Sequence, residues 1–357
     1  MSHTNEQRIE HLATRRELPP DQWQALFETW DESDRRFAAQ LAAEASRSHF
    51  GNRIFVRGIV EFSNFCRNDC LYCGLRSSNT HCRRYRLDET QILASCRSGY
   101  RYGFRTFVFQ SGEDPQWSPV RLAALVRRVH EDFPDCAITL SVGELNREDY
   151  AQLRTAGADR YLLRHESAEP AHYATLHPVR QSWENRMQCL HCLKSLGFQT
   201  GCGFMVGAPG QQVAHLVREM LFLAEFQPAM IGIGPFIPHR DTPLASAAAG
   251  SAKLTLFLLS LLRLQHPAAL LPATTALATL LPNGREAGIL AGANVIMPNI
   301  SPEFAAKNYI LYDNMKSEAA NSSVMDSELQ RRMEAIGYTL TVARGDYRSA
   351  DSTGGGQ

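Results

Sequence analysis

Short apolar runs alternate with longer amphipathic stretches from residue 53 onward, and this alternation constrains the possible fold most strongly. The runs have the length of strands, and the stretches between them repeat apolar residues at helical spacing. Strands that alternate with helices pair in parallel through βαβ units. The runs expected as strands are 54–62, 105–110, 137–142, 160–164, 200–206, 230–236, 271–275 and 294–297.

These units predict an α/β fold, a complete (β/α)8 barrel of the TIM type with its active site at the carboxyl ends of the strands. Glycines stand where helices should end before strands, at Gly103, Gly157, Gly197 and Gly292. The run 271–275 carries the weakest strand pattern of the set. A six-unit open barrel with extra C-terminal structure is therefore the alternative.

The pattern divides the chain into four parts. Residues 1–50 are expected to form an N-terminal helical extension whose stripe of Trp23, Leu26, Phe27 and Trp30 packs on the outside of the main domain. Residues 51–312 would form the barrel. Residues 313–343 are expected to be a C-terminal helical segment with a helix at 327–336, and residues 344–357 a disordered tail.

Charge and composition exclude some functions and favour a cellular location. Lys plus Arg and Asp plus Glu both number 37 in the 357 residues, so nothing indicates a nucleic-acid or membrane surface. The first residues are polar and have no signal-peptide core. Nine cysteines in such a chain favour a reducing, cytoplasmic location. We expect a monomer.

Cys66, Cys70 and Cys73 form a Cys-x3-Cys-x2-Cys motif directly after the first expected strand. Thiolates are the ligands of iron–sulfur clusters, and three of them can hold three irons of a [4Fe–4S] cube. The fourth iron would remain open, as in catalytic metal sites. A structural zinc site needs four ligands, and no second Cys or His knuckle lies at a suitable distance. A disulfide pair plus a spare cysteine would suit an exported chain, and the first residues do not have the pattern of an export signal.

The cysteine spacing resembles that of the radical S-adenosylmethionine (radical SAM) enzymes. This resemblance implies one [4Fe–4S] cluster whose open iron takes the amino and carboxylate groups of SAM. One electron then splits SAM to give a 5′-deoxyadenosyl radical. Tyr72 matches the position that in this superfamily stacks near the adenine of SAM.

Polar residues that follow the other expected strands would meet on the same rim as the cysteines. Gly112 would allow the backbone to approach a ligand closely, and Glu113 could accept from an ammonium group. Arg164 suits a carboxylate held bidentately, and Glu166 suits a ribose hydroxyl or an ammonium group. Arg186 could hold the carboxylate of SAM.

Two hydroxyls, from Thr274 and Thr275, stand at the end of the run 271–275. They could bind a substrate carboxylate. Considered alone, a Thr-Thr pair in a strand is better explained by ordinary β propensity.

The chain also resembles HydE, the radical SAM maturase of [FeFe]-hydrogenase, over about residues 50–312. The matching segments are 58–75, 110–115, 159–166, 205–211, 231–244, 272–276 and 292–299. The stretches Gly-Ile-Gly-Pro-Phe-Ile-Pro-His and Ala-Asn-Val-Ile-Met-Pro-Asn carry it most specifically. The resemblance implies a barrel with an internal cavity, with SAM and the cluster at the top and substrate deeper inside.

By matching motifs, the resemblance assigns two groups of residues. On the SAM side fall Tyr72, Gly112, Glu113, Ser141, Glu166, Arg186 and Ile231. On the substrate side fall Arg164, Thr274, Thr275 and Tyr309. The resemblance also implies an organometallic or other small-molecule substrate, a cysteine-bearing iron carbonyl cyanide precursor of the diiron site of the H-cluster. Reduced ferredoxin or flavodoxin would donate the electron, and other hydrogenase maturases would be further partners.

Three other functions remain open at this point. A HydE-like paralogue could act on another small amino-acid or thioether substrate, by mutase or sulfur chemistry. Sulfur insertion of the biotin synthase type needs an auxiliary cluster held by several strand cysteines, and only Cys202 lies mid-strand. A non-enzymatic iron–sulfur scaffold is the third.

Many HydE proteins bind a second cluster through C-terminal cysteines. Cys202 is the last cysteine here, so we expect no second cluster in the C-terminal part of this chain.

Overall fold

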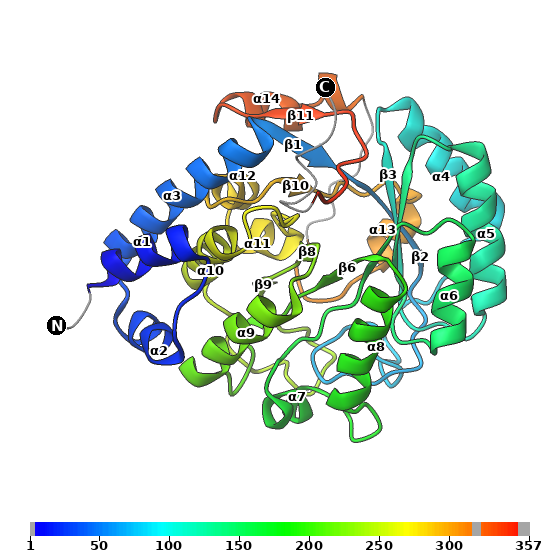
Figure 1. The fold of residues 1–357 in the computed structure, drawn as a ribbon. Helices are drawn as coiled ribbons and strands as arrows, with labels where there is room; N and C mark the ends of the chain where they lie inside the picture. The colour runs from blue at the N-terminus through cyan, green and yellow to red at the C-terminus, as the bar shows by residue number, and fades with distance from the viewer. Residues whose placement is uncertain (1–3, 316–322, 349–357) are drawn as a thin grey trace.

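The computed structural model describes residues 4–315 and 323–348, which form an α/β fold around parallel strands (Figure 1). The largest sheet has the order β2-β3-β4-β5-β6-β8, and each neighbouring pair is parallel. Its strands are β2 (Gly58–Ser63), β3 (Thr106–Ser111), β4 (Ala137–Ser141), β5 (Arg160–Leu162), β6 (Gln199–Cys202) and β8 (Met230–Ile231). The predicted alternation of strands and helices is confirmed for this part of the chain.

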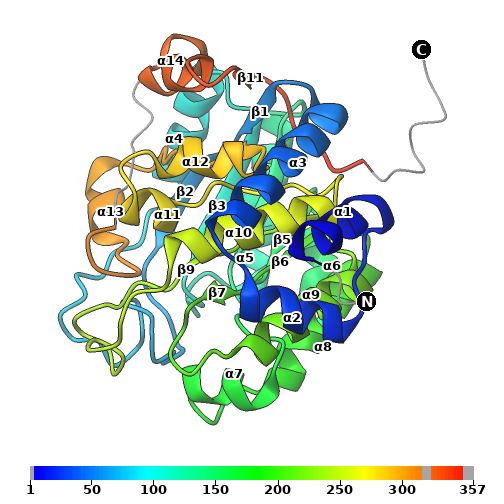
Figure 2. The ribbon, with the colours of Figure 1, turned by 90° about the vertical axis from the view of Figure 1, so that its left-hand side faces the viewer.

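Helices connect these strands and cover the outside of the sheet (Figures 1 and 2). They are α4 (Glu89–Arg101), α5 (Pro119–Asp132), α6 (Arg147–Thr155), α7 (Pro170–Leu176), α8 (Trp183–Ser195), α9 (Val213–Phe226) and α10 (Ala252–Gln265). The side chains of Asp88, Ser118, Asn146, Ser182 and Ser251 cap the N-termini of five of them. Gly103, Gly157, Gly197 and Gly292 all have positive φ at helix ends, which confirms their predicted place.

Three of the expected strands are each split into two shorter strands, and one strand of each pair belongs to a smaller sheet. A three-stranded sheet has the order β10-β1-β11, with β1 at Arg53–Val56 and β10 at Val295–Ile296. A two-stranded sheet pairs β7 (Met205–Val206) with β9 (Gly234–Pro235). The run 54–62 is therefore β1 followed by β2, and the runs 200–206 and 230–236 are each divided in the same way.

The prediction of a strand at 271–275 is wrong. Only isolated parallel bridges form here, Met230↔Leu270 and Pro272↔Val295, and α11 (Thr275–Leu280) already begins at Thr275. Pro272 has no N–H to donate to a ladder, which limits pairing. Among the described residues the named strands form no closed sheet, although a further bridge joins Ile59 to Asn299.

The N-terminal helices α1 (Asn5–Arg15), α2 (Pro20–Thr29) and α3 (Glu32–Phe50) pack on the outside of this assembly. Trp23 and Leu26 are fully buried, and Trp30 stacks on Phe257 of α10 with 4.8 Å between ring centroids. The predicted packing of the aromatic stripe is confirmed. No helix within the described ranges has both the length and the apolar character needed to cross a membrane.

The C-terminal part contains α12 (Gly284–Leu290), α13 (Glu303–Asn308), the 3-10 turn η1 (Val324–Asp326) and α14 (Glu328–Glu334). The expected helix at 327–336 is thus present as α14. A strand that was not predicted, β11 (Thr339–Thr341), pairs with β1. A helical pattern alone does not reveal a strand of three residues that is stabilised by a distant partner.

The tail was expected to be disordered from residue 344, and this is wrong for residues 344–348. Arg344 pairs with Asp159 at 2.8 Å, and Asp346 pairs with the buried Arg160 at 2.6 Å. These ion pairs connect residues far apart in the sequence, so composition alone could not indicate them. Residues 349–357 lie outside the described part of the chain.

Glu61 is a buried carboxyl group in β2, near the bridge between Ile59 and Asn299. Its Oε2 atom accepts a hydrogen bond from Asn299 Nδ2 at 2.6 Å, and its side chain has little contact with solvent. Burial raises the pKa of Glu61 from 4.5 to about 8, although the hydrogen bond from Asn299 acts in the opposite direction. Glu61 is therefore protonated in the folded protein near neutral pH.

This pKa predicts a loss of stability at alkaline pH. Because the folded state binds the proton of Glu61 more tightly than the unfolded state, the contribution of Glu61 to folding stability is complete below pH 4.5. This contribution is lost as the pH rises toward about 8. The loss should be on the order of 2–5 kcal/mol, and Glu61→Gln should remove most of it. Anaerobic urea unfolding from pH 4.5 to 9 measures this, with Glu10→Gln at an exposed position of α1 as control. Equal pH profiles for wild type and Glu61→Gln would contradict it.

Candidate active site

The three motif cysteines lie on a long loop, residues 64–88, that follows β2 and precedes α4. The Arg84 guanidinium holds the loop together by donating to the carbonyl oxygens of Asn64, Leu75 and Arg76 at 2.5, 2.9 and 2.6 Å. Asp69 pairs with Arg76 at 2.6 Å across the same loop. The loop therefore keeps its shape through its own arginines rather than through a helix or strand.

Gly112, after β3, allows the cysteine loop to pack closely against the end of this strand. A Cβ atom at this position would lie 2.3 Å from the carbonyl oxygen of Phe65 and 2.7 Å from Cβ of Cys66. The backbone N–H of Arg67 also donates to the carbonyl of Glu113 at 2.9 Å. The close approach predicted for Gly112 is thus present, and the partner in this structure is the cysteine loop itself.

Cys66, Cys70 and Cys73 are all free and partly exposed at the residue level. Burial of the sulfur raises the pKa of all three thiols, that of Cys70 to about 12, so they keep their protons unless a cation replaces them. No described group of three or more His, Cys, Asp or Glu side chains is arranged to hold a single metal ion. A cubic cluster makes a different demand, because each thiolate binds a separate iron. The donor set therefore fits a [4Fe–4S] cluster.

A cavity of about 340 Å³ lies directly behind Cys73 and is lined by residues from the carboxyl ends of several strands. The predicted residues that line it are Tyr72, Ser141, Arg164, Glu166, Arg186, Thr274 and Tyr309. The fold thus brings together most of the SAM-side and substrate-side residues around one space. It also adds Gln110 and Tyr312, which the sequence did not single out.

Several buried polar atoms in this cavity make no hydrogen bond within the described part of the protein. They include Nε and Nη2 of Arg164, Oε2 of Glu166 and Oγ1 of Thr274, all of which are buried and make no hydrogen bond. Arg164 Nη2 lies 3.1 Å from Glu166 Oε2, which makes an ion pair by distance without hydrogen-bond geometry. Buried polar groups normally have partners. The cavity therefore fits a ligand with carboxylate, ammonium or hydroxyl groups, which SAM carries.

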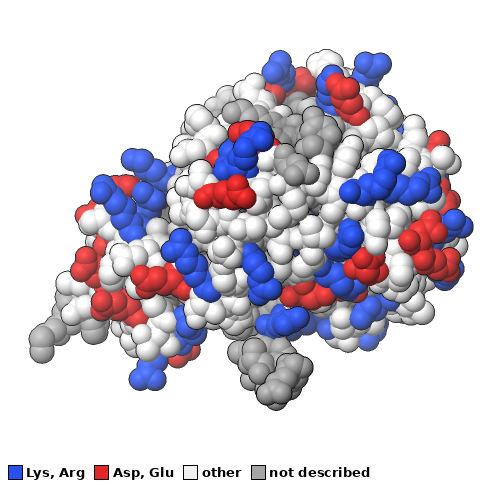
Figure 3. Space-filling model, turned by 90° about the horizontal axis from the view of Figure 1, so that it is seen from above, with Lys and Arg blue, Asp and Glu red and all other residues white. Residues whose placement is uncertain are grey.

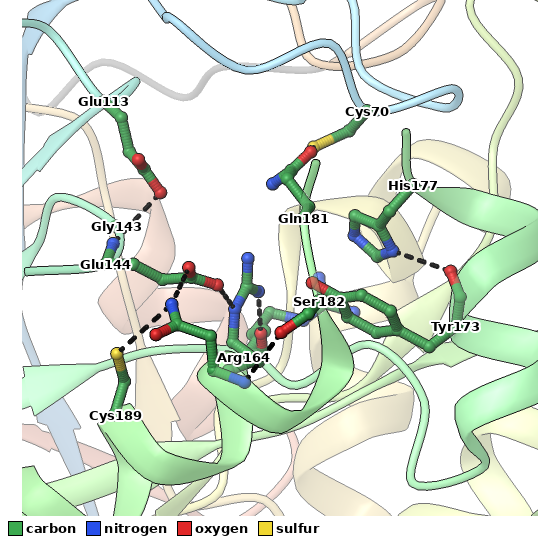
Figure 4. A network of polar contacts seen from close by, with 12 residues as sticks. Cys70, Glu113, Gly143, Glu144, Arg164, Tyr173, His177, Gln181, Ser182 and Cys189 are labelled. Carbon is green, nitrogen blue, oxygen red and sulfur yellow. Dashed lines mark hydrogen bonds and ion pairs between the residues drawn. The ribbon is translucent and has the colours of Figure 1, made fainter. Parts of the chain in front are cut away.

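Arg186 of α8 connects two segments that form one wall of the cavity. It forms an ion pair with Glu144 and donates from Nη1 to the carbonyl oxygen of Arg164 at 2.6 Å. Figure 4 shows Glu144 and Arg164 on this wall, with Cys70 and Gln181 pointing toward one another nearby. Arg186 thus fixes the end of β5, and Glu144 is a site residue that sequence reasoning missed.

Tyr72 is held by a neutral histidine. Burial lowers the pKa of His177 to about 3, and its Nδ1 lies 3.0 Å from the carbonyl oxygen of Tyr173. Nδ1 must therefore be the donor, which leaves Nε2, at 3.3 Å, to accept from the hydroxyl of Tyr72. The ring that lines the cavity beside Cys73 is oriented by this bond.

A buried histidine–carboxylate pair lies next to Glu166, which itself has a positive φ of 64°. His165 Nε2 is 2.6 Å from Glu219 Oε2, and Glu219 Oε1 accepts from the N–H of Ala168 at 2.7 Å. The N–H of Gly203 donates to His165 Nδ1 at 3.3 Å, so Nε2 is the atom that donates to Glu219. These bonds from both sides hold the Glu166 backbone in a conformation that is uncommon for a residue with a side chain.

Four of the residues assigned to the SAM side or the substrate side do not line the cavity. Gly112 and Glu113 line a separate crevice of about 570 Å³, where Glu113 pairs with Arg67 at 2.9 Å. Thr275 is the first residue of α11, and Ile231 is fully buried in the hydrophobic core. Strand alternation could have indicated this for Ile231, because Gly232 and Gly234 are the residues that line the cavity.

The chain is similar to known proteins in both sequence and fold. The model of the radical SAM superfamily matches residues 60–223. The [FeFe] hydrogenase maturase subunit HydE of Thermotoga maritima is 47% identical over 273 residues, which are 76% of this chain and 78% of the relative. A 3-methylornithine synthase of Methanosarcina acetivorans is 27% identical over 298 residues, which are 82% of this chain and 83% of the relative.

Solved structures with low sequence identity share the fold. Methylornithine synthase (PylB) superimposes with a TM-score of 0.78 at 24% identity, over 93% of this chain and 97% of that chain. HydG, a maturase of the [FeFe]-hydrogenase, gives a TM-score of 0.80 at 19% identity, over 96% of this chain and 77% of that chain. At these identities the likeness supports the architecture alone.

Proposed function

This chain belongs to the HydE family within the radical SAM superfamily, and on that premise we propose that it serves in the maturation of [FeFe]-hydrogenase. It is a radical SAM enzyme, and the family implies a [4Fe–4S] cluster and SAM as cofactors. The observation that carries the proposal is the polar cavity directly behind the cysteine loop. A hydrogenase-producing host that lacks its own HydE tests it, because this chain should restore hydrogenase activity there and a Cys66→Ala variant should not.

In this proposal Cys66, Cys70 and Cys73 hold the cluster. When bound, the cluster and SAM together supply a one-electron cleavage that yields a 5′-deoxyadenosyl radical. The chain's own residues orient and shield that chemistry. Tyr72, Ser141, Glu166 and Arg186 face SAM from the cavity wall, and Gly112 and Glu113 support the cysteine loop from outside. Ile231 does not line the cavity, so it would act only by packing its strand into the hydrophobic core.

On the substrate side we assign Arg164, Thr274 and Tyr309, which come from distant parts of the chain and line the same cavity. One fixed cation and two hydroxyls suit the carboxylate of a cysteine-like group. For a member of the HydE family, the resemblance implies that this group belongs to a cysteine-bearing iron carbonyl cyanide precursor. Thr275 would act by setting the start of α11.

A second candidate is a HydE-like paralogue acting on another small amino acid, which the resemblance to 3-methylornithine synthase favours. The restoration of hydrogenase activity separates the two functions. Sulfur insertion with an auxiliary cluster has little support, because Cys202 is fully buried in the hydrophobic core and does not line the cavity.

Several finer features belong to the same proposal. The bridges Met230↔Leu270, Pro272↔Val295 and Ile59↔Asn299 support a complete (β/α)8 barrel within residues 51–312. Residues 1–50 would be a helical extension, and residues 313–343 a C-terminal segment. Nine free cysteines support a reducing, cytoplasmic location. We expect the protein to be a monomer. Reduced ferredoxin or flavodoxin and the other maturases would be its partners.

The iron content gives a direct test of the cluster assignment. Anaerobic reconstitution should give about four irons per chain, the content of one cube. Iron analysis and electron paramagnetic resonance of the reduced protein measure this. A variant with Ala at Cys66, Cys70 and Cys73 should bind no cluster, and eight irons in two spectroscopically distinct clusters would contradict the assignment.

A further inference from the structure

Positive charge is concentrated on the segment that carries the cysteines. The cysteine loop, residues 64–88, contains five arginines and two aspartates, a balance of +3, whereas the whole chain has a formal net charge of zero. On the face that carries α14 and β11, at the opposite end from the cysteine loop in Figures 1 and 2, positive and negative side chains are mixed (Figure 3). The cysteine loop therefore differs in charge from the rest of the molecule.

Three of the five arginines have structural partners that account for them. Arg84 donates to loop carbonyls, Arg76 pairs with Asp69, and Arg86 pairs with the buried Asp114 at 2.6 Å. The other two, Arg67 and Arg83, are exposed. The Arg67 side chain keeps 58% of its exposure even though it contacts Glu113. Arg67 also donates to the carbonyl oxygen of Glu144 at 3.3 Å, but more than half of its side chain still faces solvent. Arg83 lines a separate pocket with His239 and Asp313, so it is not considered further.

A second loop, residues 177–182 between α7 and α8, adds to the same surface. Arg180 is exposed and donates to the carbonyl oxygen of Arg67 at 2.6 Å, and Gln181 accepts from Cys70 Sγ at 3.3 Å. Val179, the residue directly before Arg180 in this loop, is an apolar residue with complete exposure (103%). We call Arg67, Val179 and Arg180 the rim patch. It combines two cations with an exposed apolar residue, and the hydrogen bonds of Arg180 and Gln181 hold this loop against the cysteine loop.

We propose that the rim patch is the docking surface for an acidic one-electron carrier protein. The inference rests on the proposed function, in which the cluster accepts one electron and the carrier is oxidised by one electron. Electron transfer weakens steeply with distance, so a carrier must dock where the cysteine loop meets solvent. Opposite charge steers such encounters, and redox interfaces are small, so a few residues suffice.

The test compares two reductants acting on the same holoenzyme. One is photoreduced flavodoxin, an acidic protein, and the other is dithionite, which needs no docking surface. Arg180→Glu and Val179→Asp should lower the flavodoxin-dependent kcat/KM for 5′-deoxyadenosine formation at least tenfold at low salt. Both variants should keep the dithionite-dependent rate within about twofold. Added salt should slow the wild-type reaction with flavodoxin and leave that with dithionite unchanged.

Arg331→Glu is the matched control, because it makes the same charge change at an exposed site on α14, on the opposite face. It should behave as wild type with both reductants. Unchanged flavodoxin kinetics in Arg180→Glu and Val179→Asp would overturn the docking surface, as would an equal loss with dithionite in both. If the wild type cleaves no SAM even with dithionite, the proposed function itself fails.

Discussion

Cys70→Ser should abolish SAM cleavage and leave the protein folded. An alcohol does not replace a thiolate as an iron ligand, so 5′-deoxyadenosine formation should fall at least 10³-fold, which corresponds to about 4 kcal/mol of barrier. The fold should persist because the loop is held by Arg84, Arg76 and the close contact at Gly112. A serine hydroxyl can still donate to Gln181 Oε1, as the thiol does. Circular dichroism measures whether the fold persists, and the 5′-deoxyadenosine assay measures SAM cleavage.

Cys82→Ser is the matched control for this experiment. Cys82 is a free, half-buried cysteine on the same loop, outside the Cys-x3-Cys-x2-Cys motif. Its substitution should leave both the iron content and SAM cleavage close to wild type. Normal cleavage in Cys70→Ser would remove Cys70 from the cluster site, and loss of cleavage in Cys82→Ser would show that the loop, not the motif, was being tested.

The sequence was most informative where a local pattern has one physical reading. The alternation of apolar runs and helices predicted β2 to β6, and the helix-ending glycines were correctly placed because positive φ strongly favours glycine. It was less informative where tertiary contacts decide. The run 271–275 is apolar enough for a strand, but Pro272 and the start of α11 leave only bridges there. Nothing local to residues 344–348 indicated that Arg344 would find Asp159.

The candidate site shows the same division. Arg164, Glu166 and Tyr309 were predicted from strand ends and family motifs, and all three line the cavity. Glu219 could not be predicted, because it lies in the middle of α9 and gains its role only when that helix packs on His165. The pairing of Arg164 with Glu166 also joins residues that the sequence had assigned to separate ligands.

That pairing makes Arg164→Ala the most informative substitution in the cavity. Two of its guanidinium nitrogens, Nε and Nη2, are buried without a hydrogen bond, so a ligand carboxylate is their expected partner. Removing the cation would leave that carboxylate unpaired, a loss of about 2–5 kcal/mol by analogy with buried charge pairs. We therefore expect substrate binding to weaken at least tenfold, while SAM still binds the cluster.

Arg164→Lys separates charge from geometry, because lysine keeps the cation and loses the bidentate fork. Its affinity for a cysteine-bearing iron carbonyl cyanide complex should fall between those of wild type and Arg164→Ala. Electron paramagnetic resonance of the reduced cluster reports SAM binding, and substrate-dependent turnover reports the other ligand. Since Glu166 Oε2 lies 3.1 Å from Arg164 Nη2, the alternative outcome is equally clear. If Arg164→Ala loses SAM binding and keeps its affinity for the complex, the ion pair serves SAM, and the substrate carboxylate must be held by Thr274 and Tyr309 instead.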